Sequence, residues 1–147
     1  MVGALNGAVV GGGLELALAC TFRVARADAR LGLPEVKLAL LPAYAGTQLL
    51  PRLVGAARAQ ELMLTGRVFD ADEAYRIGLV VDVLDDDALL DAAITKAHEI
   101  MRNAPFGVAL TKEGMWSALE IPALQNAIDL ENRQQIMASA TADHREA

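Results

Sequence analysis

A run of three glycines stands directly before an apolar segment of this chain. It lies in GAVVGGGLELALAC, residues 7–20. Glycine lets the backbone turn tightly and approach another group closely. The residues that follow favour a helix from about Leu14 to Cys20, with the carboxylate Glu15 near its start. We therefore expect a tight turn whose backbone carries no side chains, followed by a buried helix with a single acid in its first turn.

Short strands and helices are expected to alternate through the N-terminal half. Residues 1–6 are typical of a short strand, and residues 21–33 of two short strands joined by a turn near Ala27 and Asp28, the second ended by Pro34. Turn and capping residues then predict a helix from the cap Thr47 to Gly55 and a second helix over 56–65 that Gly66 ends. A capping box begins a third helix, from Asp70 to Gly78, and a strand follows within 79–84.

The C-terminal part is predicted to be helical. Three aspartates, residues 85–87, suit the positive start of a helix over about 87–103. Pro105 and Pro122 are then predicted to begin two more helices, because proline is allowed in the first turn of a helix. The sequence therefore predicts an α/β region over residues 1–84 followed by an all-helical region over residues 85–147.

Composition and charge exclude several classes of protein. The net charge of −6, with no basic stripe to offset it, excludes a nucleic-acid partner. Cys20 is the single cysteine, so no disulfide can form within the chain, and we expect a buried thiol and a reducing, cytoplasmic location. The apolar run of residues 8–20 is too short to cross a membrane. No cluster of histidine, cysteine and carboxylate side chains has metal-ligand spacing.

The glycine run does not match the common phosphate-binding motifs. A dinucleotide fingerprint requires a glycine three residues after Gly13, where this chain has Leu16. The Gly-Lys-Ser/Thr of a P-loop is absent. Two interpretations remain. The turn either packs closely and binds nothing, or its N–H groups hold an oxygen that becomes negative during a reaction, such as a thioester carbonyl that turns into an enolate.

Two carboxylates are candidates for acid–base chemistry, and each has a simpler interpretation. Glu15 could stabilise the helix dipole, or it could be buried in a helix that is apolar almost all round and serve as an acid or base. Glu35 follows a strand end and Pro34, where side chains often face a cleft, or it could form an ordinary surface contact with Lys37. The sequence alone does not place Glu15 and Glu35 near each other.

Four segments in order resemble the enoyl-CoA hydratase/isomerase family, the crotonases. They are NGAVVGGGLELALAC, LGLPEVKLALLP, GTQLLPRLVGAARAQELMLTGRVFDADEAYRIGLV and the ending TADHREA. The resemblance implies a fold of stacked ββα turns, with a helical C-terminal region that forms homotrimers or hexamers. It also implies an acyl-CoA thioester as substrate and no cofactor, because coenzyme A is part of the substrate.

The resemblance also implies roles for individual residues. Gly12 matches one of two backbone N–H donors that hold the thioester oxygen. Glu15 matches the glutamate that positions and activates a water, and Glu35 matches the glutamate that exchanges a proton with the α-carbon. Gly11 and the loop residues Pro42, Ala43 and Tyr44 would lie around the acyl group. Family isomerases often lack the first glutamate, so the pair favours addition of water to a trans-2-enoyl-CoA.

The chain departs from the family pattern in two places. The glycine-rich PGAGGT of the family is PAYAGT here, so Ala43, Tyr44 and Ala45 are bulkier near the reacting carbons. The family also has several earlier ββα turns, the second N–H donor and a final helix segment, which we expect to be missing from this chain. The alternatives are a double-bond isomerase or a CoA-thioester hydrolase on the same scaffold, or a truncated oligomerisation module without activity.

Overall fold

The structure, a computed structural model, describes residues 1–146. It divides into two compact units, Met1–Ala97 and His98–Ala147. The last strand ends at Leu84, and every regular element described after it is a helix. The boundary between the units falls inside the first of these helices, and a division into domains at residue 84 stays a prediction.

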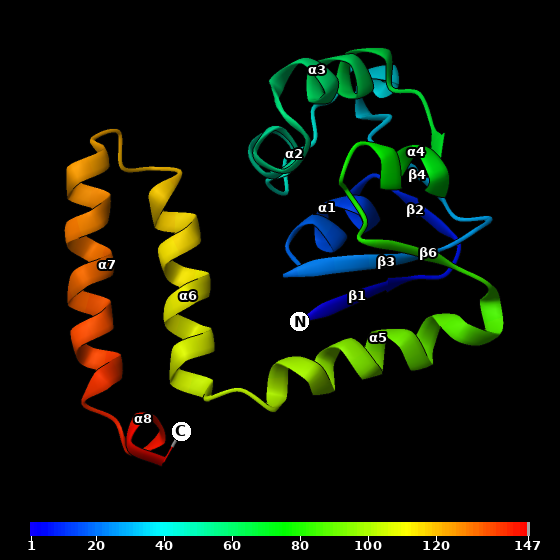
Figure 1. Ribbon diagram of the computed structural model, residues 1–147. Coiled ribbons are helices and arrows are strands. Elements are labelled where there is room, and N and C mark those ends of the chain that lie inside the picture. Colours follow the sequence, from blue (N-terminus) through cyan, green and yellow to red (C-terminus); the bar gives the residue numbers. More distant parts are fainter. Residues whose placement is uncertain (147) are drawn as a thin grey trace. The chain divides into compact units, whose positions relative to one another are not determined.

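Three parallel strands form the first sheet of the N-terminal unit. They are β1 (Val2–Leu5), β3 (Phe22–Arg26) and β6 (Asp82–Leu84), in the order β1-β3-β6. The helix α5 (Asp86–Met101) packs against this sheet, where Leu89 and Ala93 form a small core with Val24 (Figure 1). Buried strands joined through helices are typical of α/β proteins, which confirms the predicted class for this part of the chain.

The second sheet contains a strand that the sequence did not predict. It consists of β2 (Ala8–Val10), β4 (Arg30–Gly32) and β5 (Phe69–Asp70), with β2 parallel and β5 antiparallel to β4. The segment Ala8–Val10 has too few residues to show a strand period, and it becomes a strand only by pairing with β4. The two strands expected within residues 21–33 are confirmed, although they belong to different sheets.

The helices of this unit lie close to their predicted positions. They are α1 (Gly12–Leu18), the 3₁₀ helix η1 (Glu35–Leu38), α2 (Gly46–Val54), α3 (Ala56–Thr65) and α4 (Ala71–Arg76). Gly55 and Gly66 end α2 and α3 as predicted. Asp70 caps α4 by accepting a hydrogen bond of 2.8 Å from the Glu73 N–H. The cap predicted at Thr47 is wrong, because α2 begins earlier and Ala45 occupies the N-cap position without a side-chain bond.

The C-terminal unit is made of helices. They are α6 (Pro105–Ala118), α7 (Leu124–Ser139) and α8 (Ala142–Glu146), together with the end of α5. Pro105 begins α6 as predicted, whereas α7 begins at Leu124 instead of Pro122. Among residues 1–146, no helix combines the length and the apolar character that a membrane crossing requires.

A buried arginine joins α1 to the turn before β6. Arg23 on β3 is 3% exposed. Its Nε donates to the Leu79 carbonyl at 2.7 Å, and its Nη1 donates to the carbonyls of Ala17 and Cys20 at 3.2 and 2.9 Å. Burial lowers the pKa of this guanidinium. The Ala17 carbonyl also accepts from the Cys20 N–H, so the side chain matters most for the buried carbonyls of Cys20 and Leu79, which follow α1 and precede β6.

We predict that Arg23→Leu lowers the free energy of unfolding by about 3 kcal/mol, because it leaves buried carbonyls without donors. Urea denaturation of the variant beside wild type measures the difference. Arg30→Leu is the matched control, since Arg30 is an exposed residue of β4, a strand of the other sheet. A loss no larger than that of the control would contradict this role for Arg23.

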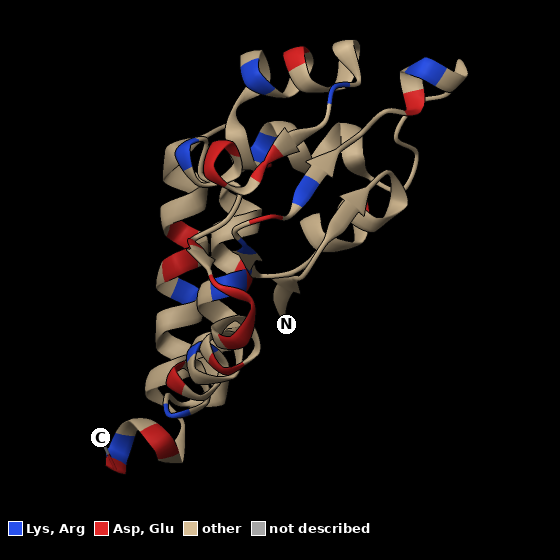
Figure 2. Cartoon of the chain, turned by 90° about the vertical axis from the view of Figure 1, so that its right-hand side faces the viewer, with Lys and Arg blue, Asp and Glu red and all other residues tan. Residues whose placement is uncertain are grey.

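An ion-pair network links α3 to α4. The Arg67 guanidinium donates to Glu61 Oε2 at 2.9 Å and to Glu73 Oε2 at 2.8 Å. These hydrogen bonds lower the pKa of both glutamates and raise the pKa of Arg67. Elsewhere on the surface, acidic and basic segments are interspersed along the helices (Figure 2).

We predict that Arg67 stabilises the fold more at neutral pH than in acid. A glutamate whose folded pKa is depressed contributes fully above its unfolded pKa of about 4.3, and the contribution is lost as the pH falls through the folded value. Urea unfolding of wild type and Arg67→Gln should therefore differ most near pH 7 and differ less below about pH 4. A difference that stays constant across this range would contradict the assignment.

Candidate active site

The glycine run forms a turn that leaves backbone donors free. Gly11 has φ 60° and ψ −132°, a conformation that is open mainly to glycine. Its N–H donates to the Gly32 carbonyl at 2.9 Å, and its own carbonyl accepts from the Glu15 N–H at 3.1 Å. Within residues 1–146, the N–H groups of Gly12 and Gly13 donate to no other residue. The turn therefore presents two unpaired donors at the start of α1.

Glu15 is buried and held by a single backbone donor. The residue is 2% exposed, and its Oε1 accepts a hydrogen bond of 2.8 Å from the Gly46 N–H. An exposed acid that only balances a helix dipole would not be enclosed in this way. The structure thus favours the interpretation of Glu15 as a buried carboxylate.

Glu35 lies against the same turn. It begins η1, directly after Pro34, and its Oε1 lies 3.2 Å from the position that a Cβ on Gly11 would take. Its Oε2 is buried and has no hydrogen-bond partner within the described residues. No ion pair joins Glu35 to Lys37 in this part of the chain. The surface contact considered for these two residues is therefore not formed.

The loop before α2 completes the arrangement. Pro42 is buried and Ala43 is exposed. A Cβ on Gly46 would lie 2.6 Å from Pro42 Cβ and 2.8 Å from Glu15 Oε1, so only glycine fits between these groups. Tyr44 is 81% exposed, and its Cδ2 lies 3.8 Å from the position of a Cβ on Gly12.

The structure therefore links candidate residues through contacts of the glycine turn and of the loop before α2. Gly11 lies against Glu35, Gly12 lies against Tyr44, and Glu15 is joined to Pro42 through Gly46. Sequence reasoning missed Gly46 and Gly32 as supports of this site. Gly46 could have been suspected from the glycine that PAYAGT retains, whereas no local signal marks the Gly32 carbonyl as the acceptor for Gly11.

Backbone strain is concentrated around the same loop. Ala39 and Ala45 have φ of 56° and 76°, in the left-handed region that costs an alanine roughly 1–2 kcal/mol. Ala45 stands where the family pattern that this loop resembles has a glycine. The substitution to alanine therefore keeps the turn but adds strain to the residue that precedes Gly46.

The two acids have no charged partner in the described part of the chain, since neither Glu15 nor Glu35 takes part in an ion pair within residues 1–146. The described part of the chain also has no group of three or more histidine, cysteine or acidic side chains that could hold a metal ion. The arrangement can thus supply two carboxyl groups for proton transfer and N–H groups for a developing negative charge.

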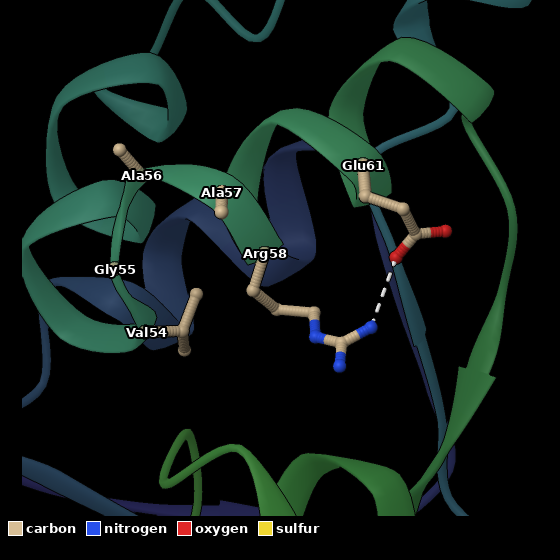
Figure 3. A pocket seen from close by; sticks show the side chains of 6 residues that line it. All are labelled: Val54, Gly55, Ala56, Ala57, Arg58 and Glu61. Atoms are coloured by element: carbon tan, nitrogen blue, oxygen red, sulfur yellow. Dashed lines mark hydrogen bonds and ion pairs between the residues drawn. The ribbon is translucent and has the colours of Figure 1, made fainter.

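A separate surface hollow lies away from these acids. It has a volume of about 520 Å³ and is lined by the α2–α3 junction, residues 54–58, and by Glu61. Arg58 points toward Glu61 along its edge, with Nη1 3.5 Å from Oε2 (Figure 3). None of the candidate site residues lines this hollow.

Comparison with known proteins identifies the family. The model of the enoyl-CoA hydratase/isomerase family matches residues 1–147. The chain belongs to the enoyl-CoA hydratase/isomerase family. The resemblance seen in the sequence is thus confirmed over the whole chain, and the α/β elements described above are those of the crotonase fold.

Relatives in this family carry hydratase names. The chain is 45% identical over 122 residues to the (E)-benzylidenesuccinyl-CoA hydratase of Thauera aromatica, covering 83% of this chain and 48% of that protein. It is 41% identical over 146 residues to a short-chain-enoyl-CoA hydratase of Clostridioides difficile, covering 99% of this chain and 93% of that protein.

A solved structure of the family has the same architecture. The enoyl-CoA hydratase of Bacillus anthracis matches with a TM-score of 0.95 at 41% identity, covering 99% of this chain and 56% of that one. The chain therefore spans about half the length of the Thauera aromatica relative and of this structure, and nearly all of the Clostridioides difficile relative.

We predict that Gly46→Ala lowers the free energy of unfolding by about 1–3 kcal/mol, the usual cost of overpacking, because the new Cβ would collide with Pro42 and Glu15. Gly13→Ala is the matched control, since a Cβ there meets nothing within 4 Å. Urea denaturation compares the two variants with wild type. Equal stability of Gly46→Ala and Gly13→Ala would contradict the close approach described for Gly46.

Proposed function

We propose that the protein containing this chain adds water to a trans-2-enoyl-CoA thioester, in fatty-acid or related acyl-CoA breakdown. The observation that carries the proposal is that the Glu35 carboxyl lies against the glycine turn, whose Gly12 and Gly13 N–H groups are unpaired within residues 1–146, while the buried Glu15 extends from the helix that this turn begins. Hydration of a conjugated thioester needs these parts, because a proton must leave water, another must reach the α-carbon, and charge develops on the thioester oxygen.

The glycine turn is the proposed binding site of the thioester oxygen. The Gly12 N–H, which has no acceptor within residues 1–146, would donate to this oxygen. Its hydrogen bond strengthens as the carbonyl becomes an enolate, so it stabilises the transition state more than the substrate. The family resemblance implies a second backbone donor to the same oxygen.

The two carboxyl groups would divide the proton transfers. Glu15 removes a proton from water while the water oxygen bonds to C3, and the electrons of the C2–C3 double bond move toward the thioester oxygen. Glu35 delivers its proton to C2 as those electrons return. The product carries a hydroxyl on C3 and one new hydrogen on C2, and proton exchange with solvent restores both carboxyl groups.

The acyl group would lie against Gly11, Pro42, Ala43 and Tyr44. No cofactor enters the proposed reaction, since coenzyme A arrives as part of the substrate. We also propose a cytoplasmic location and a homotrimer or hexamer formed by the helical region. Large apolar side chains exposed on α6, at its C-cap and on α7 support the oligomer: Met115, Leu119, Leu124, Ile136 and Met137.

We predict that Glu15→Gln and Glu35→Gln each lower kcat by about 10²- to 10⁴-fold, the range expected when a proton-transfer group is removed. Crotonyl-CoA turnover is measured with the complete translated protein that contains residues 1–147. Glu120→Gln, a change on an exposed residue of the C-terminal unit, is the control and should keep wild-type kcat.

The products separate the possible activities. Addition of water to crotonyl-CoA supports the proposal, whereas a shifted double bond or free coenzyme A would identify an isomerase or a thioester hydrolase. Wild-type kcat in both glutamate variants would overturn the assigned roles. A protein that neither binds nor converts acyl-CoA thioesters would instead be an oligomerisation module.

A further inference from the structure

The carboxyl group of Glu35 is not held by any bond of its own. Its buried Oε2 has no hydrogen-bond partner within the described residues, unlike the Glu15 carboxylate, which accepts from Gly46. Glu35 begins a 3₁₀ helix of four residues, and such a short helix depends on its surroundings. The position of this carboxyl group must therefore be set by what packs against η1 and the strand before it.

One backbone segment, Gly66–Val68, packs against both. On one side, the carbonyl oxygen of Arg67 and the Cα of Val68 lie 3.1 and 3.3 Å from the position of a Cβ on Gly32, the last residue of β4. On the other side, a Cβ on Gly66 would lie 3.0 Å from Val36 Cγ1 and 3.3 Å from Lys37 Cγ in η1. The segment is thus in close contact with the chain on either side of Pro34 and Glu35.

The side chain of Arg67 fixes this segment to two helices. Its guanidinium binds Glu61 of α3 with Nη2–Oε2 at 2.9 Å, and Glu73 of α4 with Nη1–Oε2 at 2.8 Å. Each glutamate accepts from two nitrogens of the guanidinium, which makes both pairs bidentate and directional. The side chains of Arg67 and Glu73 are 34% and 17% exposed, so this pair is partly shielded from solvent.

We propose that Arg67 is a positioning residue for the acid–base group Glu35, because its pairs with Glu61 and Glu73 hold Gly66–Val68 against β4 and η1. The inference rests on the proposed function. Arg67 itself lies outside the candidate site, and no contact between its side chain and Glu35 is involved. Loss of the pairs should loosen η1 and move the Glu35 carboxyl without changing its chemistry.

Hydrogen exchange tests whether Arg67 holds η1 in place, and this experiment does not require enzymatic activity. The Leu40 N–H donates to the Glu35 carbonyl at 3.0 Å and reports on η1, while the Ala19 N–H donates to the Glu15 carbonyl at 3.3 Å and reports on α1. In Arg67→Gln, the Leu40 amide should exchange on the order of 10-fold faster, with Ala19 unchanged. Arg67→Lys should fall between this variant and wild type, because it keeps the charge but not the bidentate geometry.

Kinetic measurements then test whether loosening of η1 impairs proton transfer by Glu35. Arg67→Gln should lower kcat on crotonyl-CoA by about 10-fold or more with little change in KM, since misplacement of a catalytic group acts on the chemical step. In the Glu35→Gln background the same change should lower kcat no further. Arg58→Gln is the matched control, because Arg58 pairs with the same two glutamates at 3.5 and 4.0 Å but lies outside the Gly66–Val68 segment.

The outcomes separate this inference from the proposed function. Unchanged exchange of Leu40 in both Arg67 variants would overturn the positioning role, as would a kcat loss that adds in full to that of Glu35→Gln. Equal effects of Arg58→Gln and Arg67→Gln would also overturn it, since any loss of charge would then suffice. A wild-type protein without hydratase activity would contradict the proposed function, and the exchange experiment would still decide whether Arg67 holds η1.

Discussion

The hydrogen bond from the Gly46 N–H to Glu15 is the interaction on which the site depends. A carboxylate as buried as Glu15 is costly unless a donor meets it, and here the donor is the backbone at the start of α2. The contact joins residues that are 31 positions apart. It requires Gly46, since any side chain there would displace either Pro42 or the carboxylate. The bond thereby fixes α1, the Pro42–Gly46 loop and α2 around one acid.

The second acid is held in a different way. Glu35 reaches the glycine turn from a short helix, and its position comes from the packing of backbone on both sides of it. The two carboxyl groups thus have separate supports, one through a direct bond and one through the Gly66–Val68 segment. Separate supports allow one group to be disturbed while the other stays in place, so their contributions can be measured independently.

Local signals predicted much of the fold. Gly66 and Gly55 ended their helices, Asp70 capped α4, and Pro105 began α6, because each of these residues acts on its own neighbours. The strand β2 was not predicted, because this short segment becomes a strand only when it pairs with β4. The Thr47 cap was wrong because the close approach of Gly46 to Glu15 sets where α2 begins.

The sequence predicted which residues belong to the candidate site, but it did not predict how they are arranged in space. The glycine run and the two glutamates were evident in the sequence, and their resemblance to one family gave them roles. Their proximity depends on contacts between β4, η1, α1 and α2, which no spacing in the sequence encodes. The same limit applies to Arg67, whose partners Glu61 and Glu73 are near in sequence but whose effect on η1 is visible only in the fold.

Conversion of crotonyl-CoA in D₂O, followed by NMR of the product, shows where water and the new proton are added. If Glu15 and Glu35 act together at the glycine turn, the product carries a hydroxyl on C3 and a single deuterium, on one face of C2. Deuterium at C2 without a C3 hydroxyl, free coenzyme A, or deuterium on both faces of C2 at early times would contradict the account.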